Sequence, residues 1–179
     1  MEQVAPGEHL SPFEAQRKIH ELLAQETRFR IIQTILGHPE HLPSLAELAY
    51  YSQKSESAVL DQLRELEAHS LVTAYELSES RGKRDLPGTF YGLTDRGVGI
   101  LDKYNYLRGL PMVQAVHENT IKTTKIRRHE GAPRPSLPDT VADALGITEG
   151  TSPGTDHEPE LPAVFEKAIR ELANQSKAE

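Results

Sequence analysis

The sequence predicts a mainly α-helical domain with one small β-hairpin, an α+β fold. Two observations predict it: apolar residues at helical spacing with capping signals between residues 11 and 72, and a pair of short segments of strand-forming residues after them. The 179 residues are enough for one domain with appendages. Because hydrophobic residues make up only 37%, the packed core must be concentrated in part of the chain.

The strongest helical signal lies in residues 55–72. Val59, Leu63 and Leu66 recur at positions i, i+4 and i+7, which places one apolar stripe on a helix. The stripe predicts that one face of this helix is buried and that the opposite face is exposed to solvent and accessible for recognition.

A shorter helix is predicted just upstream. Ser44 and Glu47 have the Ser-x-x-Glu spacing of a capping box, and apolar residues follow at helical spacing. Residues 51–54 join the two helices, so the pair is a candidate helix-turn-helix.

Two more helices are predicted before this pair. Ser11 and Pro12 form an N-cap followed by proline at the first helical position, which begins a helix that runs to about residue 24. Thr27 opens the next helix and Gly37 ends it.

A hairpin is predicted after the helix-turn-helix. Residues 71–77 and 89–93 are rich in strand formers, and a polar segment with Gly82 separates them. Three helices followed by a hairpin give the order of a winged helix, with a basic wing at residues 80–88. The wing cations are Arg81, Lys83 and Arg84.

Thr94 and Asp95 cap a further helix, whose apolar residues spread over more than one narrow stripe. Such a helix needs two neighbours, of which one is its own domain. We predict that the other is a second subunit, because two-fold dimers are the commonest assembly; the alternative is the N-terminal helix of the same chain. The predicted dimerisation residues are Val98, Leu101, Tyr104 and Leu107.

Four regions are expected along the chain. Residues 1–10 form a mobile N-terminus, residues 11–118 the winged-helix domain with its dimerisation helix, and residues 119–138 a basic arm and proline-rich linker, too rich in proline for a packed element. Residues 139–179 form a partly disordered tail with short amphipathic helices, one of them at 161–174. This tail is acidic, because it holds nine of the 27 acidic residues and three of the 20 basic ones.

The basic arm carries a local excess of positive charge. Its cations are Lys122, Lys125, Arg127, Arg128 and Arg134, and Glu130 is the acidic residue among them. Two interpretations stay open for this arm: an additional contact with phosphate groups, or a solvated helix end.

Several classes of function are disfavoured. The chain has no cysteine, no apolar stretch long enough for a membrane span and no signal-peptide pattern at its start, so we expect a cytoplasmic protein. Phosphate-loop, dinucleotide-binding, zinc-protease and nucleophile-elbow motifs are missing, and we expect neither an enzyme nor a cofactor. His38 and His41 flank Pro39 in a loop without a third nearby ligand, which favours surface histidines over a metal site.

These segments resemble a known family. SESAVLDQLRELEAHSLV, the basic hairpin and FYGLTDRG resemble the recognition helix, wing and closing strand of winged helix-turn-helix transcriptional regulators of the broad ArsR, MarR and PadR type. TRFRIIQTILGH resembles the first core helix of that group, and HEGAPRPSLP after YNYLRGLP is similar to regulators of halophilic archaea. The resemblance covers about residues 12–118.

The resemblance implies a homodimer whose recognition helices, residues 55–69, enter successive major grooves of double-stranded DNA about 34 Å apart. Ser57 and Gln62 would read bases, while Lys54 and the wing would hold phosphates. The positions implied to face DNA are Lys54, Ser55, Ser57, Ala58, Asp61, Gln62, Arg81, Lys83 and Arg84. The effector ligand is unknown, and cysteine-based metal sensing is not inherited because the chain lacks cysteine.

The recognition helix departs from the family pattern because it is acidic. Glu56, Asp61, Glu65 and Glu67 stand against Arg64 alone, whereas most members place Lys or Arg here. Three accounts remain open: DNA binding with bridging cations at high salt, use of Asp61 on cytosine, or loss of DNA binding. The sequence therefore predicts a sequence-specific DNA-binding regulator, with a protein-interaction module in a regulatory assembly as the alternative.

Overall fold

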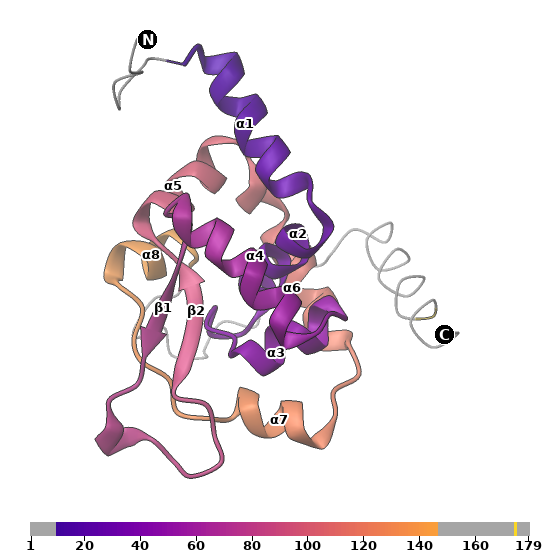
Figure 1. The fold of residues 1–179 in the computed structure, drawn as a ribbon, viewed down its shortest axis with the longest axis vertical. Coiled ribbons are helices and arrows are strands. Elements are labelled where there is room, and N and C mark those ends of the chain that lie inside the picture. Colours follow the sequence, from indigo (N-terminus) through magenta and orange to yellow (C-terminus); the bar gives the residue numbers. More distant parts are fainter. Residues whose placement is uncertain (1–9, 147–173, 175–179) are drawn as a thin grey trace, which may run out of the picture.

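The computed structural model describes residues 10–146 and residue 174. Four helices precede an antiparallel hairpin and four follow it in the described chain (Figure 1). They are α1 (Pro12–Ala24), α2 (Glu26–Gly37), α3 (Leu45–Ser52), α4 (Glu56–Ala68), β1 (Val72–Glu76), β2 (Thr89–Leu93), α5 (Asp95–Lys103), α6 (Leu110–Asn119), α7 (Thr124–Glu130) and α8 (Asp139–Ala144), with short 3-10 helices η1 (Glu79–Arg81) and η2 (Tyr106–Gly109). The predicted order of helices and hairpin is confirmed.

Local signals set the helix starts. The Ser11 hydroxyl accepts a hydrogen bond from the Glu14 amide at 3.2 Å, with Pro12 in the first turn. Both bonds of the predicted capping box form, since the Ser44 hydroxyl accepts from the Glu47 amide and the Glu47 carboxylate accepts from the Ser44 amide.

The hairpin pairs Val72 with Leu93 at its base and Glu76 with Thr89 towards its loop. A bridge between Ser44 and Phe90 joins the residue before α3 to β2. The hairpin is therefore fixed to the helix-turn-helix by backbone contacts as well as by packing.

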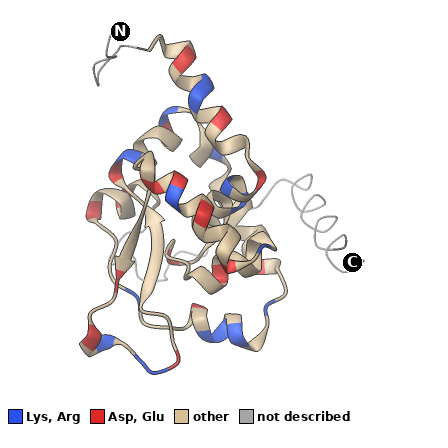
Figure 2. Cartoon of the chain, viewed as in Figure 1, with Lys and Arg blue, Asp and Glu red and all other residues tan. Residues whose placement is uncertain are grey.

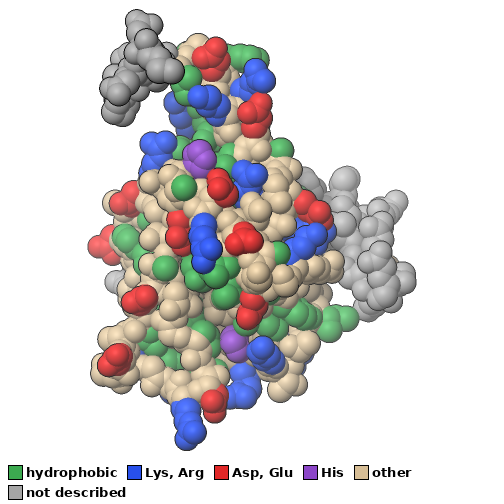
Figure 3. Space-filling model, in the orientation of Figure 1, with side chains coloured by type: hydrophobic (Ala, Val, Ile, Leu, Met, Phe, Trp, Pro, Cys, Tyr) green, Lys and Arg blue, Asp and Glu red, His purple; other side chains and the backbone are tan. Residues whose placement is uncertain are grey.

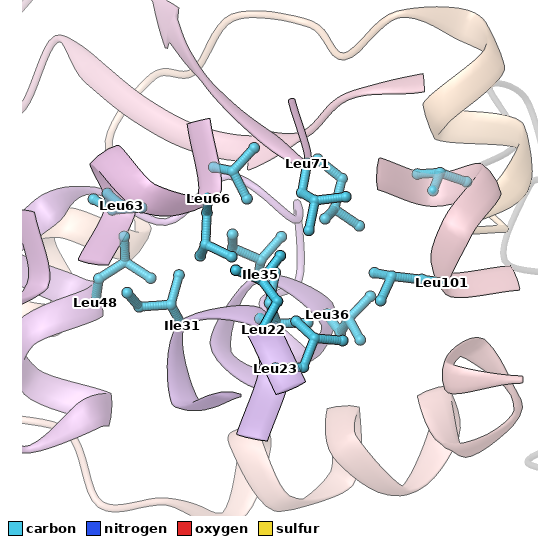
Figure 4. Packing of buried hydrophobic residues seen from close by; sticks show 14 of the residues in the cluster. Leu22, Leu23, Ile31, Ile35, Leu36, Leu48, Leu63, Leu66, Leu71 and Leu101 are labelled. Atoms are coloured by element: carbon cyan, nitrogen blue, oxygen red, sulfur yellow. The ribbon is translucent and has the colours of Figure 1, made fainter. Parts of the chain in front are cut away.

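The core gathers around α2 (Figure 4). Ile31 and Ile35 of this helix are fully buried, and they face Leu63 and Leu66 of α4 and Leu48 of α3. Burying each such side chain contributes about 1.5–3 kcal/mol. The inward stripe of α4 is the predicted one, and its burial fixes which side of α4 faces solvent.

The helix predicted after the hairpin does not reach the last two predicted dimerisation residues, Tyr104 and Leu107. It ends at Lys103, because Asn105 adopts a left-handed conformation with φ of 65°. Asparagine tolerates this backbone region better than most residues. η2 and α6 then turn back along α2, and the residues on the two sides of Asn105 do not share one helical face.

The segment after α7 is packed, so the interpretation that it is too rich in proline for a packed element is wrong. Ala132 and Arg134 are buried, and Val141 and Leu145 of the α8 region join the core cluster. Residues 139–145 thus belong to the same packed unit as the hairpin. Of the N-terminus expected to be mobile, only Leu10 is among the described residues, and of the helix expected at 161–174 only Asn174 is, so these two predictions lie outside the described chain.

No helix in the described part of the chain has both the length and the apolar character that crossing a bilayer requires.

Gly97 and Gly99 of α5 provide a matched test of this packing. A Cβ added to Gly97 would collide with the backbone of Leu71, whereas one added to Gly99 meets nothing within 4 Å. We predict that Gly97→Ala lowers the free energy of unfolding by about 1–3 kcal/mol through overpacking. Gly99→Ala should raise it by about 0.5–1 kcal/mol, because alanine favours the helix. Urea denaturation measures both, and equal effects of the two changes would contradict the close approach of α5 to Leu71.

Candidate nucleic-acid interface

The outward face of α4 carries the predicted base-reading residues. Ser57 and Asp61 are exposed, and Ala58 and Gln62 are half-buried beside the core stripe. Ser55 is exposed, but its hydroxyl accepts from the Ala58 amide at 3.1 Å and so caps the helix. Four of these predicted positions therefore share one accessible face, while the Ser55 hydroxyl has a structural role.

Charges around α4 are mixed in sign. Arg64 lies 3.8 Å from Asp61, and Lys54, just before the helix, lies 3.7 Å from Glu26 of α2. Both pairs are exposed and contribute little stability. Glu56, Glu65 and Glu67 are also exposed, so the acidic character that the sequence predicted for this face is retained.

The wing cations are accessible. Arg81, Lys83 and Arg84 are all exposed in the loop beyond the last strand pair, and among the described residues none of them forms an ion pair. Figure 2 places the wing and α7 at the same end of the molecule, where Lys and Arg gather. Figure 3 shows acidic and basic side chains interspersed over the middle of that view.

α7 covers the outer face of α3. Its Ile126 is buried, and the Tyr50 hydroxyl of α3 donates to the carbonyl oxygen of Ile121 just before it. The sequence located this basic arm but gave no sign of where it packs.

A buried ion pair lies beneath α7, and sequence reasoning missed it. The Nη2 of Arg134 donates to the two carboxylate oxygens of Glu47 at 3.0 and 2.8 Å, and Arg134 and Glu47 are 8% and 0% exposed. The guanidinium also donates to the carbonyl oxygens of Leu42, His129 and Glu130, and it lies 4.8 Å from the Phe90 ring. No spacing in the sequence links Arg134 to Glu47, because they stand 87 positions apart in the chain.

His38 completes this buried group, so the interpretation of His38 and His41 as surface histidines is wrong: each is 1% exposed. The Glu40 amide donates to Nδ1 of His38, which leaves Nε2 to carry the proton and donate to Glu47 at 2.9 Å. His41 bonds through Nδ1 to the Ile35 carbonyl oxygen. Both rings bond backbone groups in or just after the last turn of α2, and the Ile35 carbonyl group that His41 bonds is buried.

Glu130 at the end of α7 organises a second polar group. Its carboxylate accepts from the Tyr51 hydroxyl at 2.6 Å, from His117 at 3.0 Å and from Lys122 at 3.1 Å. Together these bonds tie α3, α6 and α7. Burial acts to raise the pKa of Glu130, but the three donors together hold it below its ordinary value.

His38, Glu47 and Glu130 place three ligand-type atoms within 4.8 Å of one another. Arg134 already occupies the cation position beside Glu47, and the Nε2 of His38 is committed as a donor. A metal ion there would displace the guanidinium and reverse the histidine tautomer. The donor set therefore fits an internal ion pair better than a metal site.

The four predicted dimerisation residues divide into two pairs. Val98 and Leu101 are buried in the core of their own chain, whereas Tyr104 and Leu107 keep partly exposed side chains. The ring centroids of His20 in α1 and Tyr104 lie 6.4 Å apart. The N-terminal helix of the same chain therefore covers part of this face, which was the alternative to a second subunit.

Comparison with solved structures matches this geometry to a protein from Halomicrobium mukohataei described as having a GntR superfamily winged-helix-turn-helix domain. The TM-score is 0.64 at 23% sequence identity, over 80% of this chain and 99% of that chain. The fold is a winged helix. A scan against protein-family models and a search of curated proteins found no match.

The winged helix should depend strongly on the Arg134–Glu47 pair. We predict that Arg134→Ala lowers the free energy of unfolding by about 3–5 kcal/mol, because it leaves the Glu47 carboxylate buried without its cation. Chemical denaturation measures the loss. Arg128→Ala, which removes an exposed arginine, should change stability by no more than about 0.5 kcal/mol. The double variant Glu47→Gln/Arg134→Met should lose less stability than Arg134→Ala, since it leaves neither charge of the pair buried. A larger loss of stability would contradict the role of Arg134 as the cation that neutralises Glu47.

The winged helix should also lose stability in acid, in two stages. Burial lowers the pKa of His41 and His117 below 6.5, so the unfolded chain takes up protons first, and stability present above pH 6.5 is lost as the pH falls. Burial acts to raise the pKa of Glu47, but the hydrogen bond from His38 and the charge of Arg134 hold this pKa below 4.5. The second stage is the loss of the stability that the ionised Glu47 carboxylate contributes, as the pH falls below 4.5. Urea denaturation at pH 7.5, 6, 5 and 4 measures the profile.

The variant His117→Gln tests the first stage, because glutamine can still donate to Glu130 but does not titrate. Its stability should fall less than that of the parent between pH 7.5 and 5. Identical profiles for the two proteins in this range would remove His117 from the explanation.

Proposed function

We propose that the protein is a cytoplasmic, sequence-specific DNA-binding transcriptional regulator. The observation that carries the proposal is the position of two surfaces on one winged helix: the polar outward face of α4, and a wing whose three arginine and lysine side chains are exposed. An α-helix of this kind fits the major groove of duplex DNA, and cations beside it fit the phosphates. Within winged-helix regulators, we assign it to the broad ArsR, MarR and PadR type.

Base reading falls to the N-terminal half of α4. Gln62 can bond adenine through both atoms of its amide, and the Ser57 hydroxyl can donate or accept. Asp61 can accept from the amino group of cytosine, provided that Arg64 screens it from the phosphates. The wing cations and Lys54 hold the phosphate backbone and set the register of α4.

We further propose that the regulator acts as a homodimer. Two features support this: Tyr104 and Leu107 retain exposed surface, and the first half of α1 projects from the body (Figure 1). Leu10 and Phe13 at this end are 42% and 73% exposed. A two-fold axis near these side chains would pair two α4 helices on one palindromic site.

A protein-interaction module in a regulatory assembly is the second candidate. The exposed carboxylates of Glu56, Asp61, Glu65 and Glu67 favour it, because they would repel phosphates wherever no cation lies between. Such a module would hold a basic partner on α4, and it would show no saturable DNA binding at any salt concentration.

The proposal predicts different effects from the wing and from α4. Changing Arg81, Lys83 and Arg84 together to Ala should weaken binding about equally for all DNA sequences, because phosphate contacts carry no sequence information. Gln62→Ala should cost about 1–3 kcal/mol on the preferred site and relax preference at one or two base pairs. Fluorescence anisotropy on duplexes from upstream of the protein's own gene, and on a scrambled duplex, measures both.

Glu76→Gln on the hairpin provides a control, since this exposed residue lies in β1 outside the proposed interface. A wing triple variant that bound DNA as tightly as the parent would rule out the proposed docking. Absence of saturable binding by the parent from low to molar potassium chloride would favour the protein-interaction module.

A further inference from the structure

α7 is held firmly against the helix-turn-helix. Its Ile126 is 3% exposed against α3, and Glu130 at its end accepts bonds from α3 and α6. The next segment is fixed by Arg134, whose guanidinium bonds Glu47 and the backbone carbonyl groups around it. The exposed side of α7 is therefore a rigid surface at a defined place.

The structure divides the cations of the basic arm into two groups. Lys122 and Arg134 have internal partners, Glu130 and Glu47, and are mostly buried. The other three are exposed, and in the described chain none of them pairs with a carboxylate. These free cations are Lys125, Arg127 and Arg128.

α7 lies between the two surfaces of the proposed DNA interface. A groove lined by Lys54, Glu56, Thr123 and Lys125 places the start of α7 beside the start of α4. At the other end, Arg81 of the wing lines one hollow together with residues 131–137, which follow α7 directly. The free cations of α7 thus lie between Lys54 and the wing, and Figure 2 shows Lys and Arg on both α7 and the wing at the same end of the molecule.

We propose that α7 is a third DNA-contacting element, which binds the phosphate backbone of duplex DNA through Lys125, Arg127 and Arg128. This rests on the proposed function and extends it beyond the recognition helix and wing. This contact compensates for the acidic face of α4. The carboxylates on α4 repel the DNA phosphates, and the attraction between three α7 cations and three further phosphates offsets that repulsion. Exposed, unpaired cations suit this role, because binding a phosphate breaks no internal ion pair.

The experiment measures DNA affinity as a function of salt for the full chain. Changing Lys125, Arg127 and Arg128 together to Ala should reduce the slope of log K against log salt concentration by about two to three, because each phosphate that a cation neutralises adds about 0.9 to that slope. Affinity should fall about equally on the preferred and the scrambled duplex. The base preference at each position should stay the same, because α4 is untouched.

Two matched variants control for charge and fold. Lys125→Arg/Arg127→Lys/Arg128→Lys keeps all three charges and should keep the salt slope of the parent. Changing Lys18, Arg96 and Lys103 to Ala removes the same net charge from exposed positions on α1 and α5, and it should leave the slope nearly unchanged. Sedimentation velocity confirms that each variant has the oligomeric state of the parent.

The outcomes separate this inference from the proposed function. If the parent binds DNA and the α7 triple variant binds with the same slope and affinity, α7 does not touch DNA and only this inference is overturned. The same holds if the α1–α5 control loses as much slope as the α7 variant, since the effect would then be one of net charge. If the parent does not bind DNA at any salt concentration, both proposals are overturned.

Discussion

The buried pair of Arg134 and Glu47 is the interaction on which the arrangement of this molecule depends. A guanidinium and a carboxylate removed from water each carry a desolvation cost of several kcal/mol, which is offset only when nearly all of their hydrogen-bonding groups find partners. Here Arg134 bonds Glu47 and four backbone carbonyl groups, and Glu47 also accepts from His38 and from the Ser44 amide. The pair therefore stabilises one specific packing of the chain.

This ion pair connects parts of the chain that are distant in sequence. Glu47 belongs to α3, the first helix of the helix-turn-helix, and its carboxylate also closes the capping box at Ser44. Arg134 follows α7, and its guanidinium lies over Phe90 of β2. One interaction thus fixes the hairpin, the helix-turn-helix and the basic arm together. The proposed recognition helix, wing and α7 share a defined geometry because of it.

Much of the fold could be predicted because its signals are local. The stripe of Val59, Leu63 and Leu66 set the buried face of α4, and the capping box fixed the start of α3 within a residue. The face predicted to mediate dimerisation could not be read from local signals, since the interruption at Asn105 depends on one backbone conformation. Val98 and Leu101 accordingly turned out to serve the core of their own chain.

The sequence by itself determined the order of helices and hairpin, and it located the polar face of α4 and the basic wing. Capping and periodicity act within a few residues, so they can be read from the chain directly. Only the tertiary structure decided that His38 is buried, that Arg134 pairs with Glu47 and that Lys125, Arg127 and Arg128 remain free. These outcomes depend on contacts between residues far apart in the chain. The spacing of residues in the basic arm does not show which of its lysines and arginines will be buried in an ion pair and which will stay exposed.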